Sequence, residues 1–344
     1  MEKLVGPGEA TRTALVVTSV SAPNQALREL AFGASARGID LYVVGDLASP
    51  ADFALDGCRF YSVDRQVKTG FRTAELCPTR HYARKNVGYL LAARDKVEII
   101  IETDDDNLPF PSFWTARSNS ISCRTLSNAG WVNVYRYFSS QNIWPRGFPL
   151  TEVLRDPPSF ESLTVGKAID CPIQQGLADE NPDVDAIYRL VLRTPVHFLK
   201  GRGIALGSGS WCPFNSQNTA WWRRAFPLLY LPAYCTFRMT DIWRSFVAQR
   251  IAWASGWSIL FHEATVWQDR NVHDLLKDFE SEIPGYLLNG RIVEALQALS
   301  LPSGQDRVFD CLRLCYEALV RRSFLDGQEL KLLEAWIEDL QAIG

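Results

Sequence analysis

The sequence lacks the features that mark membrane-spanning, secreted and nucleic-acid-binding proteins. No stretch approaches the about 20 consecutive apolar residues of a membrane-spanning helix, and residues 1–10 lack the apolar core of a signal peptide. The 344 residues carry 36 basic and 39 acidic side chains, with no basic block. A chain with this balance does not attract nucleic acid or an anionic membrane through bulk charge. We therefore expect no transmembrane segment and no nucleic-acid partner.

The cysteines also lack the spacing of a metal site. None of the eight belongs to a Cys-x-x-Cys pair, and the chain has four histidines in all. Cys311 and Cys315 lie four residues apart in a leucine-rich helical pattern, where buried thiols are expected. A chain of this length does not need disulfides to be stable. The cysteines therefore predict a reduced, cytoplasmic protein.

Two glycine-rich phosphate-binding motifs are missing as well. The sequence contains neither G-x-G-x-x-G nor G-x-x-x-x-G-K-[ST]. A dinucleotide-binding fingerprint and a P-loop are thereby excluded.

The first third of the chain has the pattern of a doubly wound α/β fold. Residues 14–17, 41–44 and 98–101 are short apolar runs that predict buried parallel strands. Residues 23–37 and 82–94 have helical patterns between them. In such folds ligands bind at the carboxyl ends of the strands.

The rest of the chain predicts short strands, long loops and then helices. Residues 109–166 are rich in aromatic and turn residues, and 201–213 are glycine-rich and predict a loop. Residues 183–192 and 241–257 predict helices, the second with Thr240 as its N-cap, and 258–261 a strand. Everything beyond about residue 275 has helical periodicity. The predicted fold class is α/β, with a Rossmann-like mixed sheet flanked by helices and a C-terminal helical appendage.

An acidic run follows the third predicted strand. Asp104, Asp105 and Asp106 come directly after the apolar run and Glu102. Adjacent carboxylates are costly unless a cation or hydrogen-bond donors offset their charge. Mg²⁺ and Mn²⁺ bind carboxylate oxygens and often keep phosphate oxygens as further ligands. The run therefore predicts a divalent cation that holds a diphosphate; a solvated acidic loop is the alternative.

Polar residues near the other strands and helices are candidates for nucleotide binding. Thr18, Ser19 and Asp46 follow the first two predicted strands, where Asp46 suits a ribose or a base; a simple turn is the alternative for Asp46. The helix before the acidic run begins with three polar residues, which could bind a phosphate or a carbonyl group of a ligand. A solvated helix end is the alternative. These three residues are Arg84, Lys85 and Asn86.

The second half offers candidates for the acceptor side. Residues 207–218 predict a loop of small residues, and three amide side chains in it could bind sugar hydroxyls: Asn215, Gln217 and Asn218. A plain surface loop is the alternative. Asp241 at a helix start is a candidate base, or a favourable charge at a helix N-terminus. One of His262, Asp269 and His273 could complete a metal shell, although such a histidine is often structural. We choose His273 among these.

Together these residues resemble the GT-A glycosyltransferases, in which a DxD motif follows a nucleotide-binding βαβ half. More narrowly the chain resembles the soluble catalytic domain of STELLO-type proteins, which are distantly similar to the reversibly glycosylated polypeptides, a family of UDP-arabinopyranose mutases. The matching stretches are VVTSVSAPNQALRELA, LYVVGD, ARKNVGYLLA, IIIETDDDN, NPDVDAIYRL, PFNSQNTAWW, TDIWRSFVAQRIAW and VWQDRNVHDLLKDFESEIPGY. The resemblance implies a GT-A-like fold with a nucleotide-sugar-binding half (1–110), an acceptor-binding half (111–275) and a helical C-terminal appendage (276–344).

The resemblance also implies an activity and residue roles. It implies a metal-dependent glycosyltransferase that uses Mn²⁺ or Mg²⁺ to move a sugar from a UDP-sugar to a hydroxyl of a carbohydrate or another acceptor. Asp104 would face the ribose and help to bind the metal, and Asp106 would bind the metal with His273. Asp105 lies between them and could contact either the ribose or the metal. Thr18, Ser19 and Asp46 would line the nucleoside, Lys85 the uracil or phosphate, and Asp241 would be the base or a positioning group. Localisation is not implied, because plant STELLO-type proteins are membrane-anchored and this sequence shows no anchor.

Three other functions remain open from the sequence. The same aspartate–metal site could serve a UDP-sugar mutase or a nucleotidyltransferase. A scaffold without turnover is the non-enzymatic alternative, although it would not need to hold repelling carboxylates together.

Overall fold

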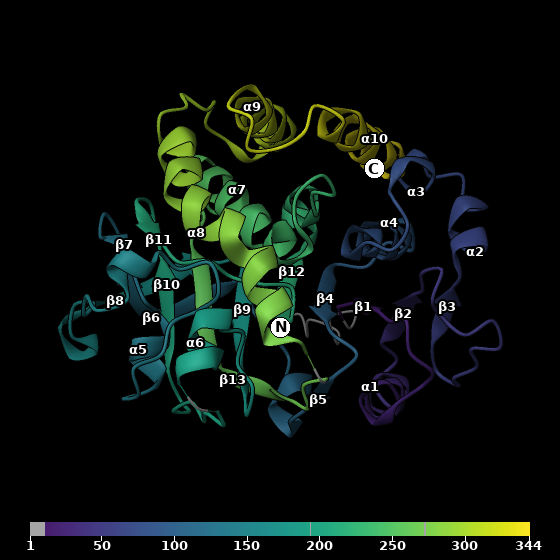
Figure 1. Cartoon of the computed structure of the whole chain (residues 1–344), viewed down its shortest axis with the longest axis horizontal. Coiled ribbons are helices and arrows are strands. Elements are labelled where there is room, and N and C mark those ends of the chain that lie inside the picture. Colours follow the sequence, from purple (N-terminus) through teal and green to yellow (C-terminus); the bar gives the residue numbers. More distant parts are fainter. Residues whose placement is uncertain (1–10, 193, 272) are drawn as a thin grey trace, which may run out of the picture.

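One mixed β-sheet runs through the molecule. The computed structural model describes residues 11–192, 194–271 and 273–344. The strands of this part of the chain are β1 (Thr13–Thr18), β2 (Asp40–Val44), β3 (Arg59–Tyr61), β4 (Ile99–Thr103), β5 (Asn107–Pro109), β6 (Ser120–Leu126), β7 (Gly130–Trp131), β8 (Thr164–Asp170), β9 (Ile173–Asp179), β10 (Gly203–Leu206), β11 (Ser210–Trp211), β12 (Asn218–Trp222) and β13 (Ile259–Gln268). Within the described residues, β3-β2-β1-β4-β12-β9-β13-β10-β6-β8 lie side by side in this order, β5 pairs with β13, and β7 pairs with β11 (Figure 1).

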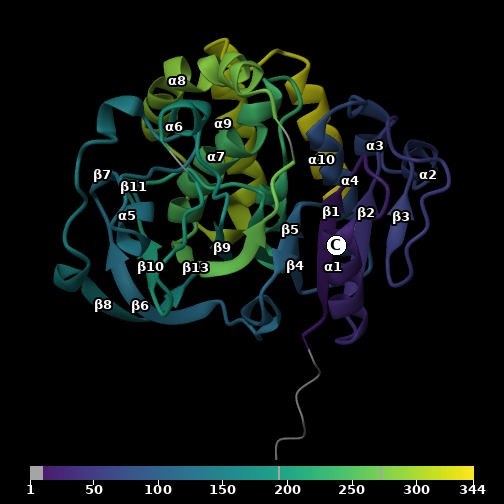
Figure 2. The ribbon, with the colours of Figure 1, turned by 60° about the horizontal axis from the view of Figure 1, so that its bottom comes forward.

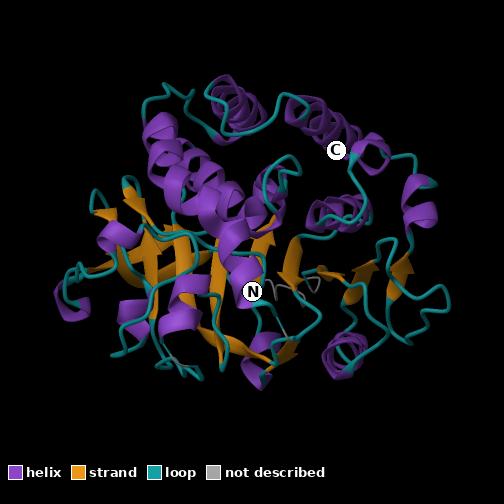
Figure 3. Cartoon of the chain, in the orientation of Figure 1, coloured by secondary structure: helices purple, strands orange, loops and turns teal. Residues whose placement is uncertain are grey.

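Helices cover both faces of this sheet. Those described are α1 (Gln25–Ser35), α2 (Val63–Val67), α3 (Arg72–Leu76), α4 (Lys85–Arg94), α5 (Tyr135–Phe138), α6 (Ala186–Val191), α7 (Thr240–Ala254), α8 (Leu275–Gln297), α9 (Val308–Arg321) and α10 (Glu329–Ile343). Figure 3 shows the long C-terminal helices together on one side and α1 on the other. The predicted fold class, an α/β sheet flanked by helices with a helical C-terminal part, is confirmed. No helix of the described residues is long and apolar enough to cross a membrane.

The predicted βαβ unit is confirmed. β1 pairs in parallel with β2 on one side and with β4 on the other. Side chains of β1 alternate between two buried clusters, so α1 covers one face and α4 the other. Gly88 of α4 lies so close to the sheet that a Cβ there would meet Val16 and Val44 at 2.6 and 2.7 Å. The carboxyl ends of β1, β2 and β4 therefore meet at one edge.

Strand β12 reverses the sheet and brings the second half to the same edge. It runs antiparallel to both β4 and β9, and β9 runs parallel to β13. The carboxyl ends of β9 and β13 consequently lie at the same edge as those of β1, β2 and β4, beside the start of β12. Loops that carry several of the candidate residues, including the aspartate run and Asp46, leave the sheet from this edge.

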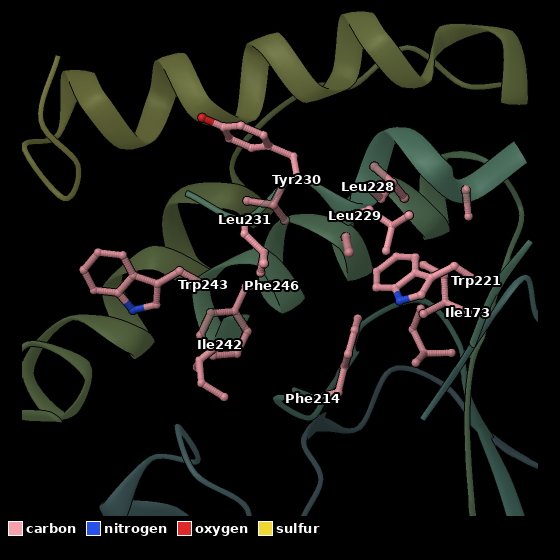
Figure 4. Packing of buried hydrophobic residues seen from close by; sticks show 14 of the residues in the cluster. Ile173, Phe214, Trp221, Leu228, Leu229, Tyr230, Leu231, Ile242, Trp243 and Phe246 are labelled. Atoms are coloured by element: carbon pink, nitrogen blue, oxygen red, sulfur yellow. The ribbon is translucent and has the colours of Figure 1, made fainter. Parts of the chain in front are cut away.

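A large aromatic core lies between the sheet and the C-terminal helices. Trp221 of β12 packs against Phe214, with ring centroids 5.9 Å apart, and both belong to the same buried cluster as Ile242 and Phe246 of α7 (Figure 4). The segment predicted as an appendage contributes to this core: Trp336 of α10 is fully buried and donates to the Pro227 carbonyl at 3.0 Å. Figure 2 shows α9 and α10 lying close against the rest of the molecule. The proposed division at residues 110 and 275 stays a prediction.

Three local predictions from the sequence are wrong. Residues 201–213 are not a plain loop, because Gly203–Leu206 form β10 between β13 and β6. Thr240 is the first helical residue of α7 rather than its N-cap, which is Met239. The strand predicted for 258–261 continues to Gln268 as β13, because it pairs with β9 along that length. Each of these differences depends on strand pairing or packing between distant segments.

A buried ion pair joins the sheet to α7. Glu102 of β4 accepts two bonds from Arg244, both at 2.8 Å, and neither side chain is more than 1% exposed. Trp221 donates to the same carboxylate at 2.8 Å, and the Tyr89 hydroxyl also donates to it. These donors satisfy the buried charge that directly precedes the aspartate run.

We expect Arg244→Met to destabilise the fold strongly, because it leaves the Glu102 carboxylate buried without its cation. Such a loss costs about 3–5 kcal/mol of unfolding free energy. Urea denaturation measures it, with Arg28→Met on the exposed surface of α1 as a control that should change stability by less than about 0.5 kcal/mol. A loss below about 1 kcal/mol in Arg244→Met would contradict this role of the pair.

Candidate functional site

A cavity of about 420 Å³ opens at the sheet edge where the strand ends meet. It is lined from the first half of the chain by the ends of β1, β2 and β4, and from the second half by the loops around β12, α7 and β13. Most of the residues singled out from the sequence line it, namely Thr18, Ser19, Asp46, Arg84, Asp104, Asp105, Asp106, Asp241 and His273. The fold therefore assembles residues that lie up to 255 positions apart in the sequence (18 to 273).

The first two aspartates of the run are held by hydrogen bonds. Asp104 accepts from the Tyr82 hydroxyl at 2.7 Å and from the Lys85 ammonium at 3.1 Å. Asp105 accepts from the Ser19 hydroxyl at 2.6 Å. Burial raises the pKa of Asp105, and the Ser19 bond opposes that shift. Both carboxylates thus have fixed orientations at the cavity wall.

Asp106 differs from its neighbours. Its Oδ2 accepts from the Gln268 amide at 3.0 Å, whereas its buried Oδ1 has no hydrogen-bond partner among the described residues. Burial, and then the charge of Asp104, raise the pKa of Asp106 to about 7. A buried carboxylate oxygen without a partner, beside two further carboxylates, is a suitable ligand for a divalent cation.

His273 lies on the opposite wall and is held by an acid. Its Nδ1 is 3.2 Å from Asp278 of α8. Burial, and then Arg270, lower the pKa of His273, which favours the neutral ring that binds metals. Nowhere in residues 11–192, 194–271 and 273–344 do three His, Cys, Asp or Glu side chains form a ready metal-binding group. A cation in this cavity would therefore need further ligands from a substrate or from water.

The helix-start residues Arg84 and Asn86 bond to other parts of the protein. Arg84 is buried, and its guanidinium donates to Gln66 and to the carbonyls of Ala74 and Cys77. Asn86 exchanges two bonds of 2.9 Å with the backbone of Leu231 and does not line the cavity. The polar groups of both residues form hydrogen bonds inside the protein, which does not favour contact with a ligand, and their nucleotide-binding role stays a prediction.

Lys85 lies under the aspartate run instead of facing a ligand. It is fully buried, and its Nζ donates to the carbonyls of Thr103 and Ser216 at 2.8 and 3.2 Å, in addition to Asp104. The Tyr82 hydroxyl also accepts from it at 2.7 Å. Lys85 therefore compensates the charge of Asp104 from within the protein.

Asp46 lines the cavity next to the ends of β1 and β2. Its carboxylate accepts from the backbone N–H groups of Leu47 and His81 at 2.7 and 3.0 Å. Thr18 and Ser19 lie beside it on the same wall. The cavity lining also includes the exposed apolar Val20 and Phe237, and the Phe237 ring centroid lies 5.8 Å from that of Tyr82.

On the other wall, Asp241 belongs to a buried chain of ion pairs. Arg146 donates to Asp241 at 2.9 to 3.1 Å and to Asp183 at 2.8 and 2.9 Å. Burial alone would raise the pKa of Asp183, but the adjacent guanidinium outweighs it and holds the pKa below its ordinary value. Asp241 also accepts from the Ser216 N–H at 3.2 Å. Because its oxygens accept these bonds, the Asp241 carboxylate is fixed in orientation.

The amides of the 207–218 loop have mixed positions. Asn215 and Gln217 line the cavity, and Asn215 donates to Asp183 at 2.9 Å. Asn218 is buried between strands, where it donates to Leu177 and Thr265. Of the three metal-shell candidates, His273 lines the cavity, whereas His262 and Asp269 do not.

Comparison with known proteins gives these features a context. Residues 238–344 match the model of the family described as STELLO glycosyltransferases. The chain is similar to the STELLO glycosyltransferases. Two curated relatives from Arabidopsis thaliana, named Probable glycosyltransferase STELLO1 and Probable glycosyltransferase STELLO2, are 27% and 26% identical over 96% of this chain. The chain spans 44% and 45% of these two relatives, less than half of either. The resemblance seen in the sequence is confirmed.

Two solved structures align with most of this chain, at low similarity. A mycobacterial protein aligns over 85% of this chain and 78% of its own, with 13% identity and a TM-score of 0.39. Glucosyl-3-phosphoglycerate synthase from M. tuberculosis aligns over 83% and 79%, with 11% identity and a TM-score of 0.40.

Several cavity residues could not be found from the sequence. Tyr82, Arg146 and Gln268 come from three separate segments, and none was expected to belong to the site, although Gln268 lies in the matching stretch VWQDRNVHDLLKDFESEIPGY. Arg146 stands alone in the segment NIWPRGFP, where a charged residue among aromatics is a weak sign of a buried partner. Their roles follow from long-range contacts.

Asp106 predicts a pH-dependent stability. Its folded-state pKa of about 7 lies above the ordinary value of 3.8, so the metal-free native state loses stability as pH rises from about 4 to 7. We expect Asp106→Asn to match the wild type near pH 4 and to be more stable at pH 8, by on the order of 2–4 kcal/mol. Urea denaturation in EDTA at both pH values measures this difference. An equal difference in unfolding free energy between Asp106→Asn and the wild type at the two pH values would contradict the raised pKa of Asp106.

Proposed function

We propose that this chain is the catalytic domain of a glycosyltransferase that uses a nucleotide diphosphate-sugar, a UDP-sugar, as donor and transfers the sugar to an acceptor hydroxyl. The observation that carries the proposal is Asp106: a buried carboxylate with an unpartnered oxygen, next to Asp104 at a strand end, facing a cavity of substrate size. Its similarity to proteins named as probable glycosyltransferases supports the same function.

In this proposal the aspartate run would hold a divalent cation, Mn²⁺ or Mg²⁺, that assists binding of the donor diphosphate. Asp106 and Asp104 would hold it, and His273 could join from the opposite wall because Asp278 orients its ring. When bound, the cation offsets the charge that develops on the departing diphosphate. Lys85 and Tyr82 keep Asp104 oriented, and Gln268 does the same for Asp106.

The first-half wall would receive the nucleoside. Thr18, Ser19 and Asp46 follow parallel strands, at the edge where doubly wound sheets bind nucleotides. The Asp46 carboxylate accepts hydrogen bonds from backbone N–H groups, so Asp46 would stabilise the loop that contacts the nucleoside.

The second-half wall would receive the acceptor. Arg146 fixes Asp241 in orientation, which suits a residue that aligns a hydroxyl or the transferred sugar. We therefore assign Asp241 to positioning of the substrates. This assignment is compatible with either stereochemical outcome at the anomeric carbon.

Asp106→Asn should weaken Mn²⁺-dependent UDP binding by at least tenfold, because a neutral amide replaces the carboxylate ligand of the cation. Calorimetric titration of UDP, with Mn²⁺ and then with EDTA, measures the effect. Asp52→Asn, on an exposed loop, is the matched control and should bind as the wild type does. Because Asp106→Asn is expected to be folded and stable at pH 8, lost binding would not reflect unfolding.

Equal UDP affinity in Asp106→Asn and the wild type would contradict the metal site. Product analysis distinguishes the candidate reactions. A glycosyltransferase releases UDP from a UDP-sugar, whereas a mutase isomerises the sugar. A nucleotidyltransferase joins a nucleoside triphosphate to a sugar phosphate and releases pyrophosphate. A scaffold would bind UDP without turnover.

A further inference from the structure

The second-half wall carries two guanidinium groups that the proposed donor site does not use. Arg238 and Arg270 line the cavity and both lie beside Asp278 of α8. Building on the proposed function, we propose that these two residues form a subsite for an anionic group, a carboxylate or phosphate, carried by the acceptor.

The guanidinium groups keep unused donors. Arg270 donates through Nη2 to Asp278 at 3.0 Å, and no other hydrogen bond is formed by its guanidinium within the described part of the chain. Arg238 donates through Nε and Nη2 to Glu282 at 3.0 and 2.7 Å, which leaves Nη1. Both side chains are nearly buried, at 11% and 12% exposure. Guanidinium N–H groups in this setting favour a planar anion that accepts two bonds.

Several arginines lie close together in this part of the cavity wall, together with the acids Asp183, Asp278 and Glu282. Arg189 lies behind them, and burial, followed by repulsion from Arg270 and Arg238, lowers the pKa of Arg189 to about 10. Burial and then Arg238 lower the pKa of Arg270 in the same way. The nearby acids Asp278 and Glu282 are each already shared with other donors. A bound anion would relieve this repulsion.

The position of the subsite favours the acceptor over the donor diphosphate. The backbone carbonyl of Arg238 accepts from Arg146, the residue that holds Asp241. The subsite therefore adjoins the residue that we assign to the acceptor, on the wall opposite Thr18, Ser19 and Asp46. Arg270 follows Asp269, whose backbone N–H donates to the Asp106 carbonyl at 2.9 Å, so an anion here would lie near the proposed metal site.

The test titrates inorganic phosphate, and then glucose 6-phosphate against glucose, into the full chain saturated with UDP and Mg²⁺. We expect phosphate to bind alongside UDP, and glucose 6-phosphate to bind at least tenfold more tightly than glucose. Arg270→Gln should lower the affinity for phosphate and for glucose 6-phosphate at least tenfold and leave the affinity for UDP unchanged. Arg270→Lys should give an intermediate loss, and Arg322→Gln, on the exposed end of α9, should give none.

Three results would overturn the proposal: no phosphate binding to the wild type, displacement of phosphate by UDP, or equal anion affinity in Arg270→Gln. Displacement would assign the cations to the donor diphosphate. If Arg270→Gln does not fold, Arg238→Gln provides the same comparison. Failure of the proposed function can be distinguished from failure of the subsite. In the first case the wild type would not bind UDP, and the phosphate titration without UDP would still test the subsite.

Discussion

The repulsion between adjacent carboxylates at the end of β4 is the constraint on which the rest of the site depends. Glu102 is neutralised inside the sheet by Arg244, and Asp104 is held by Lys85 from below. Asp105 is bonded to Ser19, and Asp106 is bonded to Gln268 at one oxygen only. The protein thus supports each carboxylate separately and leaves one oxygen for something outside the chain. Residues from four distant segments are fixed in place by this single requirement.

The sheet edge could be predicted because its determinants are local. Short apolar runs with polar residues behind them mark β1, β2 and β4, and parallel pairing then brings Thr18, Asp46 and the aspartates to one edge. The pattern needs no knowledge of distant contacts. The location of the cavity and most of its first-half wall were therefore accessible from the sequence.

The second-half wall and the direction of individual side chains were not accessible. Asn86 was expected to face a ligand because it begins a helix, yet it pairs with Leu231, 145 positions away. Arg146 gave no signal, because its partners Asp183 and Asp241 lie 37 and 95 positions later. Strand β10 was hidden in a glycine-rich segment, since its partners β6 and β13 come from either side in the sequence. Orientation depends on tertiary partners, which hydrophobic periodicity does not encode.

Helix α8 has a consequence for how this site can diversify. It supplies Asp278 and Glu282, which hold Arg238, Arg270 and His273, whereas the aspartates and the nucleoside wall rest on β1, β2, β4 and α4. If the proposed function holds, acceptor recognition would depend largely on α8, and most of the donor site would depend on the first half of the chain. Substitutions on one face of α8 would then change which acceptor is taken and leave most of the donor site unchanged.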